Sequence, residues 1–462
     1  MKNENITRSN RSRSSRDPIW TCVAGDPGVV HQRGNVSSDS ELSRLAQGKH
    51  GLSVISAAVF IAGEMAGSGV LALSRAAIDA GWIGLILVIV FCINAGYAGS
   101  RLGVCWEILE ERYLDYRQPV RNPYATIAYR AVGTWGRKLV SFCIQFTLFG
   151  AGTVYLLLAA QIVKDLLDDY METFGTCIWF LIIALILLPA MWLGSPKDFW
   201  LVGVGALLTT AIACVLIFTQ MVLDGFNKQD ASKSKVHGFH DFFISFGTIL
   251  FAFGGASTFP TIQNDMVNKE KFSKSVFIAF SVILGLYIPV TFGGYFVYGE
   301  MVTPNVILSL GHSSLVRMAN VLMAVHLVLA FLIVINPVCQ ELEEVFDIPT
   351  DFGVKRCILR SCIMLMMVIV GETIPKFRNI LALVGGSTIT LLTFVFPPLF
   401  YMLLCRQRNP QWSERPIPLH VHVYLWELIL IGIFGGTACT YSAILAIFKP
   451  DSLSLPCYWS ST

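Results

Sequence analysis

Residues 61–70 interrupt the first apolar segment of the chain with the sequence Ile61-Ala62-Gly63-Glu64-Met65-Ala66-Gly67-Ser68-Gly69-Val70. Apolar residues dominate before this stretch, over residues 52–60, and after it, as far as residue 73. A membrane helix tolerates irregular backbone only where that backbone is buried in protein or lines a cavity. The stretch therefore predicts a helix that is broken within a membrane, and such breaks are typical of binding sites.

A second interruption supports this interpretation. Residues 251–260 read Phe251-Ala252-Phe253-Gly254-Gly255-Ala256-Ser257-Thr258-Phe259-Pro260. The two stretches occupy corresponding positions, in the first and sixth apolar segments, if five segments form a repeat. The alternative is that their glycines only allow helices to pack closely, because membrane helices are rich in glycine.

The composition indicates an integral membrane protein. Hydrophobic residues make up 54% of the 462 residues and charged residues only 14%, whereas soluble domains carry about 25% charged residues. The net charge of +3 gives no support to nucleic-acid binding. We predict an all-α protein with eleven transmembrane helices. They lie near residues 52–78, 82–105, 138–163, 174–194, 199–223, 242–264, 275–298, 315–340, 355–371, 379–404 and 424–448.

The distribution of basic residues predicts the orientation. With the N-terminus in the cytosol, the inner segments hold most of the 34 Lys and Arg residues, in agreement with the positive-inside rule. We expect three parts: a disordered cytosolic tail over residues 1–50, a transmembrane domain over 51–450 and a short tail over 451–462. For the location of the protein we keep two alternatives, the plasma membrane and an endolysosomal membrane.

Several motifs resemble the amino acid/auxin permease family, also known as the amino acid transporter transmembrane family. The run Ala66-Gly67-Ser68-Gly69-Val70-Leu71-Ala72-Leu73 resembles the signature of its first helix. Further similarities are Val154-Tyr155-Leu156-Leu157, Phe251-Ala252-Phe253-Gly254-Gly255 and Phe396-Pro397-Pro398-Leu399-Phe400-Tyr401. The resemblance covers roughly residues 50–450.

The resemblance implies a leucine-transporter-like fold, with two inverted five-helix repeats and an extra helix. It also implies that Tyr155 closes over a substrate carboxylate, although a tyrosine at the membrane interface is an equal alternative. One departure is that Ser74 and Arg75 stand where family members commonly have a proline. Without the proline ring, nothing forces a kink there.

An amino acid has a carboxylate and an ammonium group, and both need partners away from water. A half-helix that begins near Ser68 would offer backbone N–H groups and a positive dipole end to the carboxylate. Glycine at positions 67 and 69 lets the backbone approach the ligand without a Cβ in the way. We therefore expect a substrate site that includes Gly63, Gly67, Ser68 and Gly69.

The sixth segment would supply the opposite wall. We expect its backbone carbonyls, over residues 253–256, to accept hydrogen bonds from the ammonium group, and Phe253 and Phe259 to line the side-chain pocket. The residues that we assign to the substrate site on this segment are Phe253, Gly254, Gly255, Ala256 and Ser257.

Two titratable residues are candidates for proton coupling. Glu64 lies deep in the first segment, where an acid must be protonated, paired or in contact with water. The alternative is that Glu64 only binds the broken backbone. His326 in the eighth segment suits a proton relay, but we favour a neutral, structural histidine. Sodium is disfavoured because residues 318–340 contain no Ser or Thr, and hard cations need oxygen ligands.

The function that we predict is secondary active transport of a small amino acid or related amine by alternating access, driven by protons. A sodium-coupled transporter and a sensor that binds an amino acid without net flux stay open as alternatives. We expect that the protein is not an enzyme and that it has neither a cofactor nor a metal site. The chain has no HExxH, Walker A or GxSxG motif. The expected partners are the amino acid, protons and the lipid bilayer.

Overall fold

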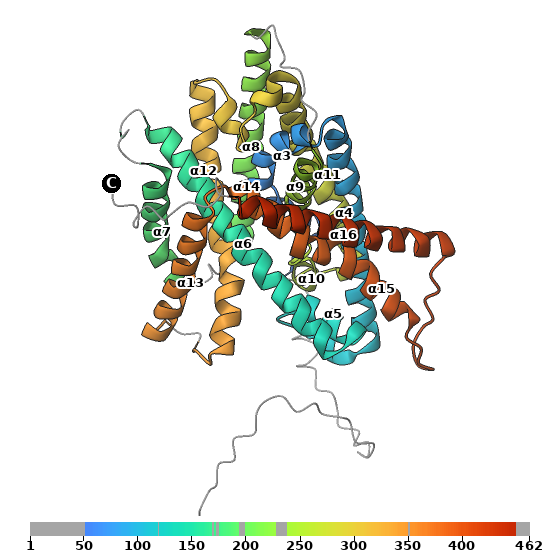
Figure 1. Ribbon diagram of the computed structural model, residues 1–462. Coiled ribbons are helices and arrows are strands. Elements are labelled where there is room, and N and C mark those ends of the chain that lie inside the picture. Colours follow the sequence, from blue (N-terminus) through green and yellow to red (C-terminus); the bar gives the residue numbers. More distant parts are fainter. Residues whose placement is uncertain are drawn as a thin grey trace, which may run out of the picture. The chain divides into compact units, whose positions relative to one another are not determined.

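The computed structural model describes residues 51–118, 120–168, 171, 175–193, 199–227, 238–349 and 352–449. The chain divides into the units Met1–Lys49 and His50–Thr462, and the described residues all belong to the second unit. That unit is helical (Figure 1), and the β-type pairing of its described residues is one bridge between Leu52 and Met266. The predicted tails, 1–50 and 451–462, lie outside the described residues.

Eight helical segments of the described residues are long and apolar enough to cross a bilayer. They consist of α4 (Trp82–Arg112), α6 (Thr134–Leu167), α7 (Thr176–Leu193), α8 (Phe199–Asn227), α11 (Phe272–Gly293), α12 (Ser314–Val345), the interrupted helix from α14 (Phe377–Val384) to α15 (Phe396–Arg406), and α16 (Leu419–Ile447). A bent pair, α2 (Val54–Met65) and α3 (Ser68–Asp79), raises the number to nine.

The predicted number of eleven spans is not confirmed by length and composition. The predicted sixth span contains α9 (Phe239–Ala252), which is short for a helix that must cross about 30 Å of hydrocarbon. The predicted ninth span is α13 (Val354–Thr373), whose first turns carry three basic residues. Shorter elements complete the unit: α5 (Pro123–Val132), α10 (Phe259–Asn264), and the 3-10 segments η1 (Leu114–Arg117), η2 (Lys269–Lys271), η4 (Gly299–Met301) and η5 (Val306–Ser309).

The first break separates α2 from α3, which differ in direction by 59°. The hydroxyl of Ser53 caps the start of α2 by accepting a hydrogen bond from the backbone N–H of Ser56 at 3.1 Å. The helix ends at Met65, and the next helix begins at Ser68 with Gly67 as its N-cap. Only two residues, Ala66 and Gly67, therefore separate the end of one helix from the start of the next.

The second break separates α9 from α10 and is longer, because residues 253–258 are not helical. Pro260 stands in the first turn of α10, where the missing N–H of proline costs no helical hydrogen bond. After α10 the chain returns to the start of the first span. Leu52 donates its N–H to the Asp265 carbonyl at 2.8 Å and accepts from the Val267 N–H at 3.1 Å.

A third irregular region lies within the span from α14 to α15. Two π-helical segments, η6 (Gly385–Ile389) and η7 (Leu391–Val395), replace regular helix there. A π-helical segment η3 (Gly294–Tyr298) also follows α11. Such bulges inside helices are frequent at functional sites, and η6 contributes a residue to the cavity described below.

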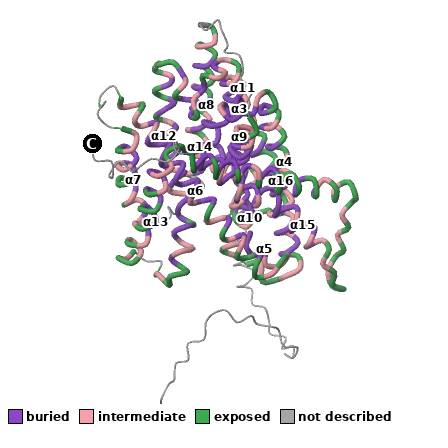
Figure 2. The backbone as a smooth tube through the Cα atoms, viewed as in Figure 1, coloured by how far each residue is buried: buried purple, intermediate pink, exposed green. Residues whose placement is uncertain are grey.

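The broken helices lie in the middle of the helical unit. In the most apolar 18 residues of α6 and of the α14–α15 span, 78% and 83% of the residues are buried, compared with 33% for α7 and for α8. Figure 2 shows buried residues concentrated around α9 and α14, while α7 and α13 carry many exposed residues at the margin. The helix α3 packs against α9, and α2 packs against α8 and α11. The two breaks therefore face each other inside protein rather than lipid.

Candidate functional site

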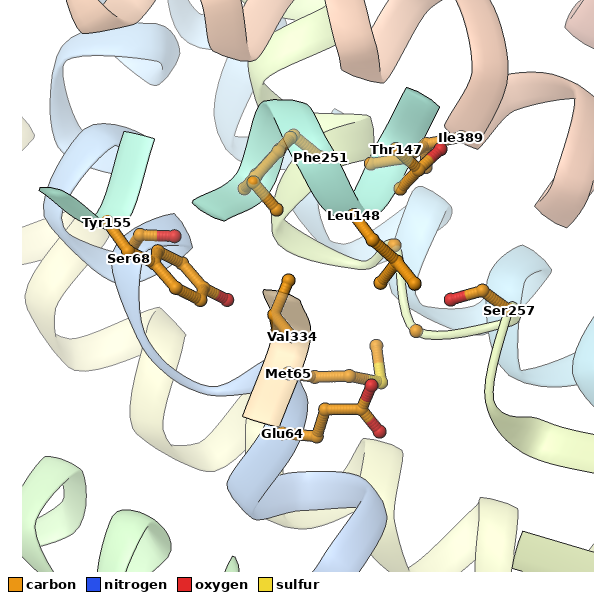
Figure 3. Close-up of a pocket in the computed structure, with 13 residues that line it drawn as sticks. Glu64, Met65, Ser68, Thr147, Leu148, Tyr155, Phe251, Ser257, Val334 and Ile389 are labelled. Carbon is orange, nitrogen blue, oxygen red and sulfur yellow. The ribbon is translucent and has the colours of Figure 1, made fainter. Parts of the chain in front are cut away.

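A cavity lies between the two breaks (Figure 3). Six helical elements (α2, α3, α6, α9, α12 and η6) and the second break contribute to its wall. The lining residues are Glu64, Met65, Ser68, Thr147, Leu148, Ala151, Tyr155, Phe251, Gly254, Gly255, Ser257, Val334 and Ile389. The wall is mostly apolar, and its hydroxyl and carboxylate groups come from α2, α3, α6 and the second break. This is the composition that a site for a small molecule with two polar ends needs.

Ser68 is the polar residue of the first break that faces the cavity. Its side chain is buried, and its hydroxyl interacts with the side chain of Tyr155. In Figure 3 the ring of Tyr155, which projects from α6, lies next to Ser68. A hydroxyl can donate one hydrogen bond and accept two, so Ser68 is suited to bind a polar ligand group at the N-terminus of α3 as well as Tyr155.

The second break presents acceptors instead. The backbone carbonyls of Phe253, Gly254 and Ala256 accept none of the hydrogen bonds found in the described part of the chain. By contrast, the Gly255 carbonyl accepts from the Thr258 N–H at 3.3 Å and from the Thr258 hydroxyl at 3.0 Å. Free carbonyls in an apolar setting are suited to bind a group that donates several hydrogen bonds.

Glu64 connects the two breaks. The Thr258 hydroxyl lies 2.7 Å from Glu64 Oε2, and the carboxyl group lines the cavity. The same hydroxyl has the Gly255 carbonyl as its other acceptor. Thr258 has one hydroxyl proton for two acceptors. If Glu64 is protonated, its own proton serves the contact with Thr258, and the Thr258 proton is left for the carbonyl of Gly255.

His326 lies behind the first break, outside the cavity lining. Its Nδ1 is 3.0 Å from the Ala206 carbonyl and 2.9 Å from the Thr210 hydroxyl, both on α8. A carbonyl can only accept, so Nδ1 carries a proton in this arrangement. The Nε2 atom is buried and has no partner among the described residues. A Cβ added to Gly67 would overlap this atom.

The structure brings together six of the residues predicted from the sequence. Glu64, Ser68, Tyr155, Gly254, Gly255 and Ser257 all line the cavity. The other predicted substrate residues, and His326, lie around it: Gly63 against the Gly203 carbonyl, Gly67 against His326, Gly69 against Ala252, Phe253 with its ring 5.6 Å from that of Tyr287, and Ala256 buried within the second break. Their part in substrate binding stays a prediction.

Seven lining residues were not predicted from the sequence. Three of them lie on α6, and these had a detectable signal. Thr147, Leu148 and Ala151 precede Tyr155 by eight, seven and four residues, which places them on the face of the helix that carries Tyr155. Met65 and Phe251 flank the breaks, but nothing in the sequence distinguishes Val334 and Ile389 from other apolar residues of their spans.

Ser74 and Arg75, which replace the proline common in the family, lie within a continuous α3. The Ser74 hydroxyl donates to the Val290 carbonyl at 3.0 Å. Arg75 donates to the carbonyls of Glu300 and Val302, both at 3.0 Å, and pairs with Asp79 at 2.6 Å. Arg378 of α14 contacts the same aspartate. Polar contacts thus hold this end of α3 against α11, α14 and the loop after η3.

The described residues contain no group of three or more His, Cys, Asp or Glu side chains that could hold a metal ion.

Comparison with known sequences gives a match to a family described as "Transmembrane amino acid transporter protein" over residues 50–442. Among curated proteins, "Amino acid transporter AVT1B" of Arabidopsis thaliana is 24% identical, over 83% of this chain and 69% of that protein. "Amino acid transporter AVT1J" of the same plant is 23% identical, over 83% of this chain and 89% of that protein.

Solved structures with a similar fold include transporters. MhsT in complex with L-phenylalanine superimposes with a TM-score of 0.51 and 14% identity, over 85% of this chain and 99% of that one. Mhp1, a nucleobase-cation-symport-1 family transporter, gives a TM-score of 0.50 and 13% identity, over 86% and 92%. The predicted fold class, an all-α membrane protein with the leucine-transporter-like arrangement, is thereby confirmed.

Proposed function

Because the chain belongs to the transmembrane amino acid transporter family, we propose that it moves a small amino acid or related amine across a membrane by alternating access. The family identity confirms a multi-pass membrane transporter and a protein that is not an enzyme. The substrate class, the coupling ion and the direction of transport are our proposals. We also propose that the N-terminus faces the cytosol, as the basic residues indicate.

The observation that carries the proposal is the complementary polarity of the two breaks. The first break offers the Ser68 hydroxyl at a helix N-terminus, and the second offers free carbonyls at residues 253, 254 and 256. A carboxylate is stabilised at the first and an ammonium group at the second. The apolar residues between them, including Leu148, Val334 and Ile389, would contact an uncharged side chain.

Proton coupling is our proposal for the driving force. Among the described residues that line the cavity, Glu64 alone carries a carboxyl group, and its contact with Thr258 links α2 to the break before α10. A change in its protonation would change which acceptor the Thr258 proton serves, and so alter the connection between the half-helices. Sodium remains the competing ion. Against it stands the lack of hydroxyl side chains over residues 318–340 of α12.

Alternating access requires that one side of the cavity opens while the other closes. The contacts of Arg75 and Arg378 with Asp79 hold α3 against α14 at one end. The pairing of Leu52 with Asp265 and Val267 holds the start of α2 to the chain after α10 at the other. We propose that α2 and α10 move together when the site opens toward the cytosol.

The proposal is tested by reconstituting the purified protein into vesicles and measuring uptake of a panel of labelled amino acids. Uptake is measured at two external pH values, with and without sodium. We expect saturable accumulation of a neutral amino acid that a pH gradient drives and sodium does not change. Binding without accumulation would identify a sensor, and uptake that needs sodium and ignores the pH gradient would refute proton coupling.

A further inference from the structure

Tyr287, in the C-terminal third of α11, contacts both breaks through one hydroxyl group. Its side chain is completely buried. The hydroxyl lies 3.0 Å from the Met65 carbonyl and 3.2 Å from the Ala252 carbonyl. Met65 is the last residue of α2 and Ala252 is the last residue of α9. The two half-helices that end at the breaks therefore meet at a single side chain from a third helix.

The two carbonyls need a donor that their own helices do not provide. The last carbonyls of a helix have no partner within the helix, and they form its negative dipole end. Here two such ends converge in an interior where an unpaired carbonyl is costly. The Tyr287 hydroxyl has one proton, so it serves both oxygens in a three-centre arrangement that is possible only while the two ends stay close together.

The packing around the hydroxyl preserves this closeness. A Cβ added to Gly69 would lie 2.7 Å from Ala252 Cα and 3.3 Å from the Tyr287 oxygen. The glycine at position 69 thus allows α3 to approach the end of α9. The Tyr287 ring packs against Phe253 with centroids 5.6 Å apart. A phenylalanine at position 287 would keep this ring contact and lose only the hydroxyl.

We propose that Tyr287 is a positioning residue that holds the C-terminal ends of α2 and α9 close together and thereby sets the affinity of the substrate site. Tyr287 itself does not line the cavity, but Met65 and its neighbours Glu64 and Ser68 do. Its effect on affinity rests on the proposed function, whereas its effect on the backbone of the breaks does not. The contact is separate from that of Glu64 with Thr258, which joins α2 to the other end of the second break.

The test compares Tyr287→Phe with Tyr295→Phe in the full chain. Tyr295 lies in η3, soon after α11, and its hydroxyl has no hydrogen bond among the described residues. The first measurement is hydrogen–deuterium exchange of the protein in lipid nanodiscs, followed at peptides that cover residues 62–70 and 250–258. The second is the KM and kcat of amino acid uptake in vesicles.

We expect Tyr287→Phe to increase exchange at both breaks and to raise KM by about tenfold, with kcat changed less than twofold. Tyr295→Phe should match the wild type in both measurements. Unchanged exchange, or an increase at only one break, would overturn the bridging role. Increased exchange at both breaks with an unchanged KM would overturn the role in affinity. If the wild type shows no uptake, the proposed function fails, and the exchange measurement still decides whether Tyr287 bridges the breaks.

Discussion

The two breaks are both rich in glycine but differ in structure. The first is a turn of two residues between half-helices of 12 residues each. The second extends over residues 253–258 and leads into α10, which has only 6 residues. As a result, the first break points the start of a helix at the cavity and the second presents backbone carbonyls. The comparison indicates that two glycine-rich breaks can supply opposite polarities to the two ends of a substrate.

The glycines of the two breaks also differ in what surrounds them. Gly67 abuts His326, whose imidazole is held by two contacts with α8. Gly255 abuts Met65, where an added Cβ would lie 2.5 Å from Sδ. Methionine is flexible and can move aside more easily than an imidazole ring whose Nδ1 is held by two contacts with α8. We therefore expect the first break to tolerate side chains less well than the second.

Gly67→Val should have the largest effect. The added side chain must displace His326 from its contacts with Ala206 and Thr210, so we expect transport to fall at least roughly 100-fold. The measurement is uptake in vesicles that contain equal amounts of folded protein. Gly205→Val is the control, because a Cβ at Gly205 meets no atom within 4 Å. Normal uptake by Gly67→Val would remove the first break from the transport mechanism.

Glu64→Gln should abolish the response to a pH gradient while exchange of substrate across the membrane continues. The amide oxygen can still accept from Thr258, but the side chain can no longer bind or release a proton. Under a gradient of one pH unit, we expect the ratio of internal to external substrate to fall about tenfold. One pH unit is a tenfold ratio of proton concentration, and the variant can no longer use it. The measurement is uptake together with substrate-dependent acidification of the vesicle interior. Persisting acidification would show that Glu64 does not carry the proton.

Gly255→Leu tests the second break. Because Met65 can move, we expect a moderate effect, a KM increase of about tenfold or less with correct folding. Kinetics of labelled amino acid uptake would detect it, and Gly285→Leu, at a glycine of α11 with open space around it, is the control. An effect as large as that of Gly67→Val would contradict the difference between the two breaks.

His326→Gln should have the smallest effect on pH dependence. The glutamine amide keeps a donor for the Ala206 carbonyl, and we favour a structural role for the histidine. The expected loss is about 1 kcal/mol of unfolding free energy, measured by thermal unfolding, with a pH profile of transport close to the wild type. A pH profile that shifts more than that of Glu64→Gln would instead assign the coupling proton to His326.

The sequence predicted the breaks and much of the cavity because a carboxyl group is rare in a membrane helix, and because clustered glycine and hydroxyl residues interrupt two otherwise apolar segments. Glu64, Ser68 and Gly255 stood out for these reasons. It did not predict Val334 or Ile389, since an apolar residue of a span looks the same whether it faces lipid or a cavity. Gly63 is the opposite case, a residue that is conspicuous in the sequence but packs against a neighbouring helix. It belongs to the conspicuous stretch, yet a side chain there would overlap the backbone of Gly203 on α8.

Tyr287 could not be predicted at all, because its role depends on a contact between residues 222 positions apart in the chain. The Glu64 contact with Thr258 is similar, at a separation of 194 positions. Sequence patterns identify elements that are unusual in themselves. They do not show which side chain from a distant helix satisfies the polar groups that a broken helix exposes.

The most direct measurement is an experimental structure of the protein in lipid with a transported amino acid bound. We predict that the ligand occupies the cavity between the breaks, with its carboxylate near Ser68 and Tyr155 and its ammonium group at the carbonyls of Phe253, Gly254 and Ala256. A transported amino acid bound elsewhere, or bound in this cavity with its two ends reversed, would contradict the assignment of opposite polarities to the two breaks.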